Sequence, residues 1–185
     1  MSPPEDRERG RLLLAIARES LAEALGLGRT GAYDEPWLRE PGATFVTLRR
    51  GGKLRGCVGS IRAWRALLDD VRHNARAAAF SDTRFAPVAP DEFPEIGVEV
   101  SLLSTPEPLA ARCEEEALAL LRPGLDGVIF ECADSRSTFL PQVWEQLPDP
   151  REFLDQLRYK AGLPPGYWSP EVRLFRYTVA KWVEE

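Results

Sequence analysis

Two residues of one strand-like segment, Arg55 and Cys57, have side chains that together could do chemistry. A hairpin turning at Gly51-Gly52 would place Leu48 opposite Arg55 and Val46 opposite Cys57, so the guanidinium and the thiol would share one face. A neighbouring cation favours the thiolate, which is a nucleophile and is easily oxidised. The spacing therefore predicts a reactive thiol at Cys57, although a free cysteine is as often a small packed apolar residue.

Other polar side chains that could accompany this thiol are spread along the chain. Glu99 and Ser101 fall together on the polar face of a strand predicted over residues 96–102, where Glu99 could act as a general base. The alternative for Glu99 is a solvated carboxylate on an edge strand. Asp82 and Arg84 could bind a ligand or only close a turn as a weak ion pair, and Gln142 could line a pocket or only satisfy backbone groups.

The sequence offers few ligands for a metal ion or cofactor. It contains one histidine, His73, and three widely spaced cysteines, Cys57, Cys113 and Cys132. We therefore expect free thiols, no zinc site and no cofactor. His73 falls opposite the apolar stripe of its predicted helix and should be exposed, so a Cys-His pair is not expected. If Cys57 is catalytic, its base should be a carboxylate such as Glu99 or Asp82.

Length and composition indicate a globular protein with one domain over residues 1–185. The polar residues 1–9 include Pro3-Pro4 and are expected to fray. The net charge of −5 argues against a general nucleic-acid binder, which needs a clustered basic surface. The early apolar run Leu12 to Ala17 is too short for a membrane span or a signal peptide. We therefore expect a cytoplasmic protein that does not bind membranes.

The periodicity of apolar residues predicts the elements that position these side chains. A helix from Ser60 as its N-cap would start directly after Cys57, and its N-terminal end would further favour the thiolate. Because at least two links read as hairpins, we predict an α/β fold of the α+β type, a mainly antiparallel sheet flanked by helices. Helices are expected over 13–25, 61–78, 114–121 and 150–161 (with Asp149 as N-cap and Gly162 as stop), and strands over 44–48, 53–59, 96–102, 128–131, 138–140 and 172–183.

Seven segments in order resemble the motifs of the AMMECR-one domain family. The resemblance implies one α/β domain with a larger and a smaller lobe. It also implies two partners. Bacterial and archaeal relatives are called protein A of the AmmeMemoRadiSam system, and this system is named with a Memo-like protein and a radical-SAM protein. The family supplies no agreed chemical activity. The segments are Leu54-Arg55-Gly56-Cys57-Val58-Gly59-Ser60, Asn74 to Phe80, Asp82-Thr83-Arg84-Phe85, Glu99 to Ser104, Gly124-Leu125-Asp126-Gly127, Phe139 to Trp144 and Lys160-Ala161-Gly162-Leu163-Pro164.

Two hypotheses about function follow from these residues. In the first, the protein is an enzyme or an enzyme subunit, and a polar pocket centred on Arg55-Gly56-Cys57 binds a small polar or anionic ligand. In the second, the protein is a non-catalytic adaptor, and the same motifs form a rigid surface for a Memo-like or radical-SAM partner. Convergence of the candidate side chains in one concave pocket would favour the enzyme.

Overall fold

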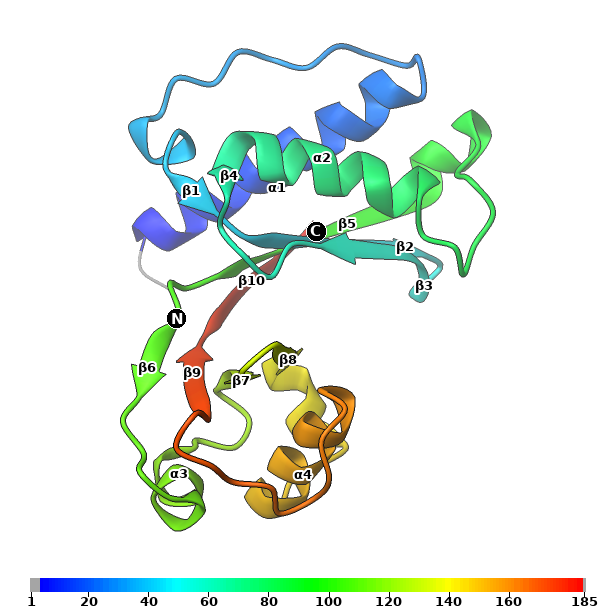
Figure 1. Cartoon of the computed structure of the whole chain (residues 1–185). Helices are drawn as coiled ribbons and strands as arrows, with labels where there is room; N and C mark the ends of the chain where they lie inside the picture. Colours follow the sequence, from blue (N-terminus) through cyan, green and yellow to red (C-terminus); the bar gives the residue numbers. More distant parts are fainter. Residues whose placement is uncertain (1–3, 185) are drawn as a thin grey trace. The chain divides into compact units, whose positions relative to one another are not determined.

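The computed structural model describes residues 4–184, which form two compact units (Figure 1). The first unit comprises residues 4–103 and 180–184, and the second comprises residues 104–179. Both units combine helices with mainly antiparallel strands, which confirms the predicted fold class. Among the described residues, no helix is both long and apolar enough to cross a membrane.

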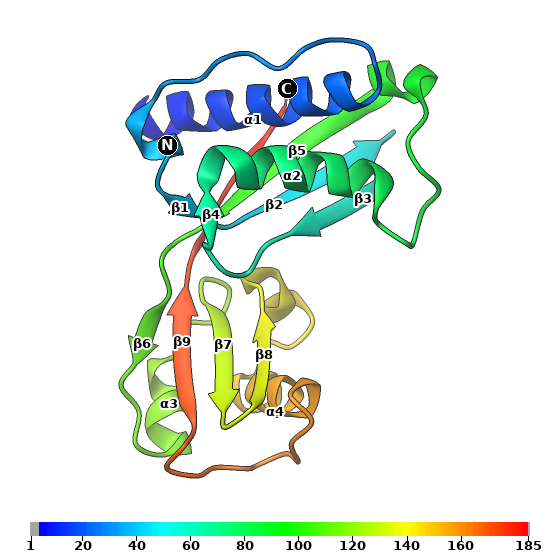
Figure 2. The ribbon, with the colours of Figure 1, turned by 45° about the horizontal axis from the view of Figure 1, so that its top comes forward.

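A four-stranded sheet forms the centre of the first unit, with α1 and α2 lying on the same face of it (Figures 1 and 2). Its strands follow the order β10 (Val179–Val183), β5 (Ile96–Leu103), β2 (Thr44–Arg50) and β3 (Lys53–Gly59), and β2 is antiparallel to both β5 and β3. The helices are α1 (Pro4–Ala24) and α2 (Leu67–Phe80). Alternate residues of β2 and β5, such as Val46 and Val100, are fully buried in one core cluster with residues of these helices. The intervening residues, among them Thr47 of β2 and Glu99 of β5, lie on the opposite face, as does Cys57 of β3, the register partner of Thr47.

The hairpin between β2 and β3 turns at the predicted dipeptide. Gly51 and Gly52 have φ angles of 55° and 76°, as a type I′ turn requires at both central positions. Arg50 lies opposite Lys53, also as predicted. The turn therefore followed from two glycines alone.

A β-bulge changes the register beyond this turn. Leu48 lies opposite Gly56, and Cys57 lies opposite Thr47, each one residue away from the predicted pairing. Arg55 is the extra residue that the bulge inserts into β3. The predicted pairings of Arg55 with Leu48 and of Cys57 with Val46 are therefore wrong.

The second helix begins later than its apolar periodicity suggested. α2 starts at Leu67 after Ala66, so the predicted N-cap at Ser60 is wrong, and Trp64 is 70% exposed. The reason lies in long-range pairing: β4 (Arg65–Ala66) is bound to β1 (Pro41–Gly42) as a two-stranded sheet, and the Ser60 hydroxyl is bonded elsewhere. Conversely, α1 starts earlier than expected, because residues 4–9 are helical. The predicted fraying of residues 1–3 lies outside the described residues.

A second four-stranded antiparallel sheet forms the other unit. Its strands follow the order β6 (Glu107–Leu109), β9 (Arg173–Tyr177), β7 (Gly127–Cys132) and β8 (Ser135–Phe139). Residues of α3 (Glu114–Leu120) and α4 (Pro150–Lys160) share its core cluster. As predicted, Asp149 caps α4 by accepting from two backbone N–H groups, and Gly162 follows the helix with φ 82°. The predicted single strand over 172–183 is wrong, because its halves, β9 and β10, belong to different sheets.

Candidate functional site

Three polar side chains form a row across the first sheet, on the face opposite α1 and α2. Thr47 on β2 lies directly opposite Cys57 on β3 and directly opposite Glu99 on β5. Residues that are register partners point to the same face, so the thiol, the hydroxyl and the carboxylate are neighbours in that order. We call Cys57, Thr47 and Glu99, with the two cations bound to Glu99, the polar row.

The thiol end of the polar row is held by Thr47. The hydroxyl Oγ1 of Thr47 donates to Cys57 Sγ at 3.3 Å. The backbone N–H of Cys57 points away from β2, so Thr47 and Cys57 form a pair without mutual backbone hydrogen bonds. Cα atoms of such pairs are only about 4.5 Å apart, which brings the side chains close together. The half-buried sulfur therefore has a hydroxyl donor beside it.

The carboxylate end is a buried glutamate with two cations. Glu99 is 7% exposed and accepts hydrogen bonds from Arg49 and from Lys181 of β10, the latter at 2.6 Å. Burial pushes the pKa of Glu99 upward, but the hydrogen bonds and charges of Lys181 and Arg49 outweigh it and leave the pKa below its ordinary value. One carboxylate and two cations leave a net charge of +1. Both cations have partly exposed side chains, 40% for Arg49 and 49% for Lys181.

Asp82 and Arg84 hold the backbone of Cys57 from the outer edge of β3. Asp82 Oδ2 accepts the Cys57 N–H at 2.8 Å, and the Arg84 guanidinium donates to the Cys57 carbonyl at 3.4 Å. The two side chains also pair with each other at 2.7 Å. The bond from Arg84 is the main cause that holds the pKa of Asp82 well below its usual range. Asp82 and Arg84 thus take the place of a neighbouring strand and fix the position of the thiol-bearing residue.

Arg55 makes a separate set of contacts. Its guanidinium forms a two-pronged ion pair with Glu92 at 2.8 and 3.0 Å, and both side chains are only 15% exposed. It also donates to the carbonyls of Ala86 and Pro87, which lie in the segment between α2 and β5. All three contacts lie within that segment, so Arg55 anchors it to the strand. Arg55 is thus largely enclosed by this segment, and its predicted role in binding a ligand remains a prediction.

The helix end that lies near Cys57 is the C-terminal end of α2, whereas the sequence predicted the N-terminal end of a helix there. A Cβ atom on Gly56 would clash with the carbonyl oxygen of Ala78, in the last turn of α2. Asp82, which binds the Cys57 N–H, follows that turn directly. The C-terminal end of α2 therefore lies beside this part of β3, so the expected support of a thiolate by a helix N-terminus is absent.

The two remaining candidates lie in different units. Ser101 is on β5, opposite Phe45 and two residues from Glu99, so it extends the same sheet face. Gln142 is exposed in a short 3-10 helix of the second unit, Pro141–Glu145. Their predicted roles in binding a ligand remain predictions.

Thr47, Arg49 and Lys181 belong to the site and were missed in the sequence. Thr47 would have been found with the correct register, because the predicted pairing placed Val46 opposite Cys57. In the sequence, Lys181 stood out only as one of three lysines in the chain. Its pairing with Glu99 spans 82 positions and depends on β10 lying beside β5.

A second buried carboxylate of the first unit, Asp70, was also missed. Its Oδ2 accepts from the N–H and hydroxyl of Thr44, both at 2.8 Å, and from Asn74 at 3.0 Å. Its Oδ1 accepts from Ser60 at 2.6 Å and from Arg65 at 2.8 Å. Asp70 is fully buried. Its bonds connect α2 to Thr44 of β2, to Arg65 of β4 and to Ser60 in the loop after β3. We call this group the Asp70 cluster.

The thiols and the histidine are found as the sequence predicted. All three cysteines are free, as expected, with Cys132 buried and Cys113 half-buried. His73 is exposed, also as expected. Among residues 4–184, no three carboxylate, thiol or imidazole side chains gather as a metal ion would require. That purified protein lacks a tightly bound metal remains a prediction for elemental analysis.

Comparisons with known proteins extend over nearly the whole chain. The model of the AMMECR1 family matches residues 14–182. A protein of Methanothermobacter thermautotrophicus is 38% identical over 94% of this chain and 93% of its own length. Protein SSO0193 of Saccharolobus solfataricus is 37% identical over 93% of this chain and 80% of its own. The crystal structure of an uncharacterized protein, PH0010 from Pyrococcus horikoshii, is similar with a TM-score of 0.80 and 33% identity, covering 96% of this chain and 92% of that one.

Proposed function

The chain belongs to the AMMECR1 family, and we propose that it is an enzyme or enzyme subunit that uses the Cys57 thiol on a small anionic substrate. The observation that carries the proposal is the hydrogen bond from Thr47 Oγ1 to Cys57 Sγ. A hydroxyl donor stabilises a thiolate more than a thiol, because bonds to charged acceptors are stronger. Thr47 therefore supports the nucleophilic form of the sulfur.

The charge of the polar row supports an anionic substrate. Arg49 and Lys181 together carry one more positive charge than Glu99 neutralises, and both have side chains that are partly exposed. Carboxylate and phosphate groups are the ligands that guanidinium and ammonium groups bind best. We infer that the substrate presents such a group to Lys181 and Arg49, with its reacting carbon toward the sulfur.

In this proposal Glu99 positions the cations rather than accepting the thiol proton. Neighbouring strands are about 4.8 Å apart, so the backbones of Cys57 and Glu99 are roughly 10 Å apart across β2. Direct proton transfer requires a separation of about 3 Å or a bridging water. The role of Glu99 is thus to hold Arg49 and Lys181 in place on the sheet face.

We propose a cytoplasmic location, because three free thiols are typical of a compartment that keeps cysteines reduced. We propose a Memo-like protein and a radical-SAM protein as partners on the strength of the family resemblance. No contact among the described residues bears on these partners.

Covalent capture tests the catalytic role. Reduced protein is incubated with the small-molecule fraction of a cell extract, and adducts are located by intact mass and peptide mapping. A mass increase on the peptide that contains Cys57 is expected, and Cys57→Ser should abolish it while the matched variant Cys113→Ser retains it. If wild type and Cys57→Ser leave the same metabolites in the extract but Cys57→Ser loses a partner in a pull-down, the adaptor hypothesis is favoured instead.

Alkylation rates test the activation of the thiol. We expect an alkylating reagent at neutral pH to modify Cys57 faster than Cys113 or Cys132, measured for each site by mass spectrometry. Thr47→Val keeps the shape of the side chain but removes the donor, so it should lower the rate at Cys57 about threefold, as for the loss of one hydrogen bond of about 0.7 kcal/mol. An unchanged rate in Thr47→Val would show that the hydroxyl does not activate the sulfur.

A further inference from the structure

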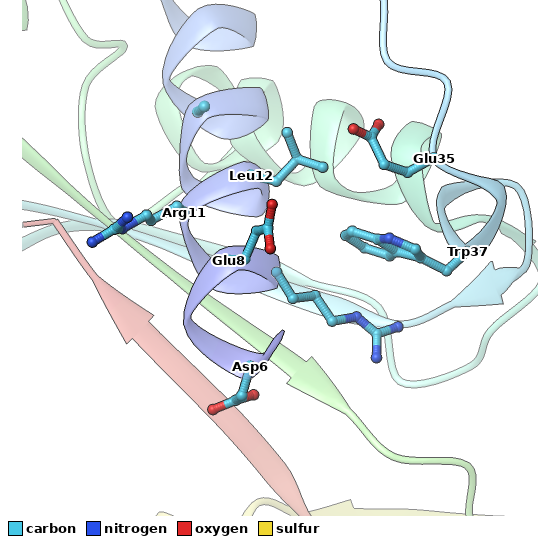
Figure 3. A pocket seen from close by; sticks show the side chains of 8 residues that line it. Asp6, Glu8, Arg11, Leu12, Glu35 and Trp37 are labelled. Atoms are coloured by element: carbon cyan, nitrogen blue, oxygen red, sulfur yellow. The ribbon is translucent and has the colours of Figure 1, made fainter. Parts of the chain in front are cut away.

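A groove of about 790 Å³ lies in the first unit between α1 and the short 3-10 helix η1, Pro36–Leu38 (Figure 3). This volume is in the range of about 300–1,000 Å³ that is usual for small-molecule sites. α1 covers the sheet face opposite the polar row, so the groove is separate from Cys57. It is lined by Asp6, Glu8, Arg9, Arg11, Leu12 and Ala15 from α1 and by Glu35 and Trp37 from the segment before β2.

One wall of the groove is an outward stripe of α1. Glu8, Leu12 and Ala15 are spaced by four and three residues, so they share one face of the helix. Figure 3 shows Glu8 and Leu12 projecting toward Trp37, whereas Arg11 extends to the other side of α1. The wall therefore combines an apolar stretch with one carboxylate.

The other wall is fixed in place by hydrogen bonds to both helices. Glu19 of α1 accepts the N–H of Gly31 at 2.7 Å, and Arg72 of α2 donates to the carbonyl of Gly31 at 2.9 Å. Thr30 donates to Glu23 at 3.2 Å. These bonds hold the segment that leads to Glu35 and Trp37, so the groove is already formed without a ligand.

The charges in the groove favour a cation. One carboxylate oxygen of Glu35, Oε2, is buried and has no hydrogen-bond partner within residues 4–184. A buried carboxylate without a partner is costly, and a nearby positive charge removes that cost. Trp37 already accepts a cation on its ring, because the Arg9 guanidinium lies 4.6 Å from the ring centre. The three lining carboxylates, Asp6, Glu8 and Glu35, exceed the two lining cations, Arg9 and Arg11, and leave a net charge of −1 for an incoming ligand to neutralise.

We propose that this groove binds a small aliphatic amine. Its ammonium lies between the carboxylates of Glu8 and Glu35, and its methylene chain lies along Leu12, Ala15 and the edge of Trp37. The apolar part of the groove selects a linear chain, and the two carboxylates select a positive charge. This site does not depend on the function proposed for Cys57.

Calorimetric titration of the full chain with 1,8-diaminooctane tests the proposal. Saturable binding of one equivalent is expected, while 1,8-octanediol, which has the same length without charge, should bind at least tenfold more weakly. Glu35→Gln and Trp37→Ala should each weaken binding of the diamine at least fivefold. Asp34→Asn is the matched control, because it removes the same charge from the neighbouring residue, which does not line the groove, and it should bind as the wild type does.

Two further measurements keep the outcome decisive. Melting temperatures of Glu35→Gln and Trp37→Ala establish that a loss of binding is not a loss of folding, and Cys57→Ser should bind the diamine unchanged. Absence of saturable binding, equal binding of the diol, or unaltered binding in folded Glu35→Gln would each overturn the proposal. Tighter binding of a lysine-containing peptide than of the diamine would overturn the assignment to a free amine.

Discussion

The two buried carboxylates of the first unit, Glu99 and Asp70, have different surroundings. Asp70 accepts five hydrogen bonds, four of them from neutral donors that belong to Thr44, Ser60 and Asn74. Glu99 is bound by the cations Arg49 and Lys181, whose side chains are partly exposed. A carboxylate enclosed by fixed neutral donors stabilises the fold, whereas one held by exposed cations leaves those cations accessible to a ligand. The difference separates a structural cluster from a candidate site.

The largest effect is expected from Asp70→Ala. The substitution would remove the acceptor of the buried Thr44 N–H and hydroxyl and the charge partner of Arg65, whereas Asn74 would keep its bond to the Thr44 carbonyl. We expect a loss of about 3–5 kcal/mol in the free energy of unfolding, as for breaking a buried ion pair. Urea unfolding measures it, with Asp69→Ala, an exposed neighbour on α2, as the control that should change little. A small loss would show that Asp70, like Glu99, contributes little to the stability of the fold, and the contrast between the two carboxylates would disappear.

A smaller loss of stability is expected from Arg55→Ala. Arg55 resembles Asp70 in being enclosed, because it binds Glu92 and two backbone carbonyls and its side chain is 15% exposed. We expect about 2–3 kcal/mol, since hydrogen bonds to charged groups contribute about 1.5–3 kcal/mol. The control is Arg50→Ala, whose partner Glu95 is 59% exposed, and it should cost much less. If Arg55→Ala melts like the wild type, Arg55 would again be free to serve a ligand site.

The smallest effect on stability is expected from Glu99→Gln. Arg49 and Lys181 can turn to solvent, so solvent screening should keep the cost within about 1 kcal/mol at pH 7. Because the pKa of Glu99 is lowered in the folded protein, its charge stabilises the fold above about pH 4.3, and this contribution disappears as the pH falls through the lowered value. Unfolding free energies of wild type and Glu99→Gln should therefore converge as the pH falls below about 4.3. A cost as large as that of Asp70→Ala would make the polar row structural.

The parts of the fold that the sequence predicted are those with local signals. Gly51-Gly52 determined the turn, and Asp149 with Pro150 determined the start of α4. The bulge at Arg55 was not predictable in this way, because its partner Glu92 is 37 positions away. Trp64 fitted a helical period but lies in a loop, since nearby Arg65-Ala66 pairs with residues 41–42. Long-range pairing therefore decided each of these errors.

The residues of the candidate site also divide into those with local signals and those that depend on long-range pairing. Cys57 and Glu99 were chosen by residue type and motif, and the structure places both on one sheet face. Their partners Thr47 and Lys181 depended on register and strand order, which apolar alternation does not specify when a bulge intervenes. Asp70 gave no signal, because an acidic residue in the first turn of a helix is ordinary.

The bond between Asp82 and the Cys57 N–H also has a consequence for association between molecules. β3 is the edge of its sheet, and a free row of N–H and C=O groups on an edge strand is a template for pairing with a strand of another chain. Asp82 and Arg84 occupy the N–H and C=O of Cys57 and place charges beside them. A second molecule cannot add its own strand there without displacing this ion pair. The residues that fix the thiol in position thus also protect the sheet from edge-to-edge aggregation.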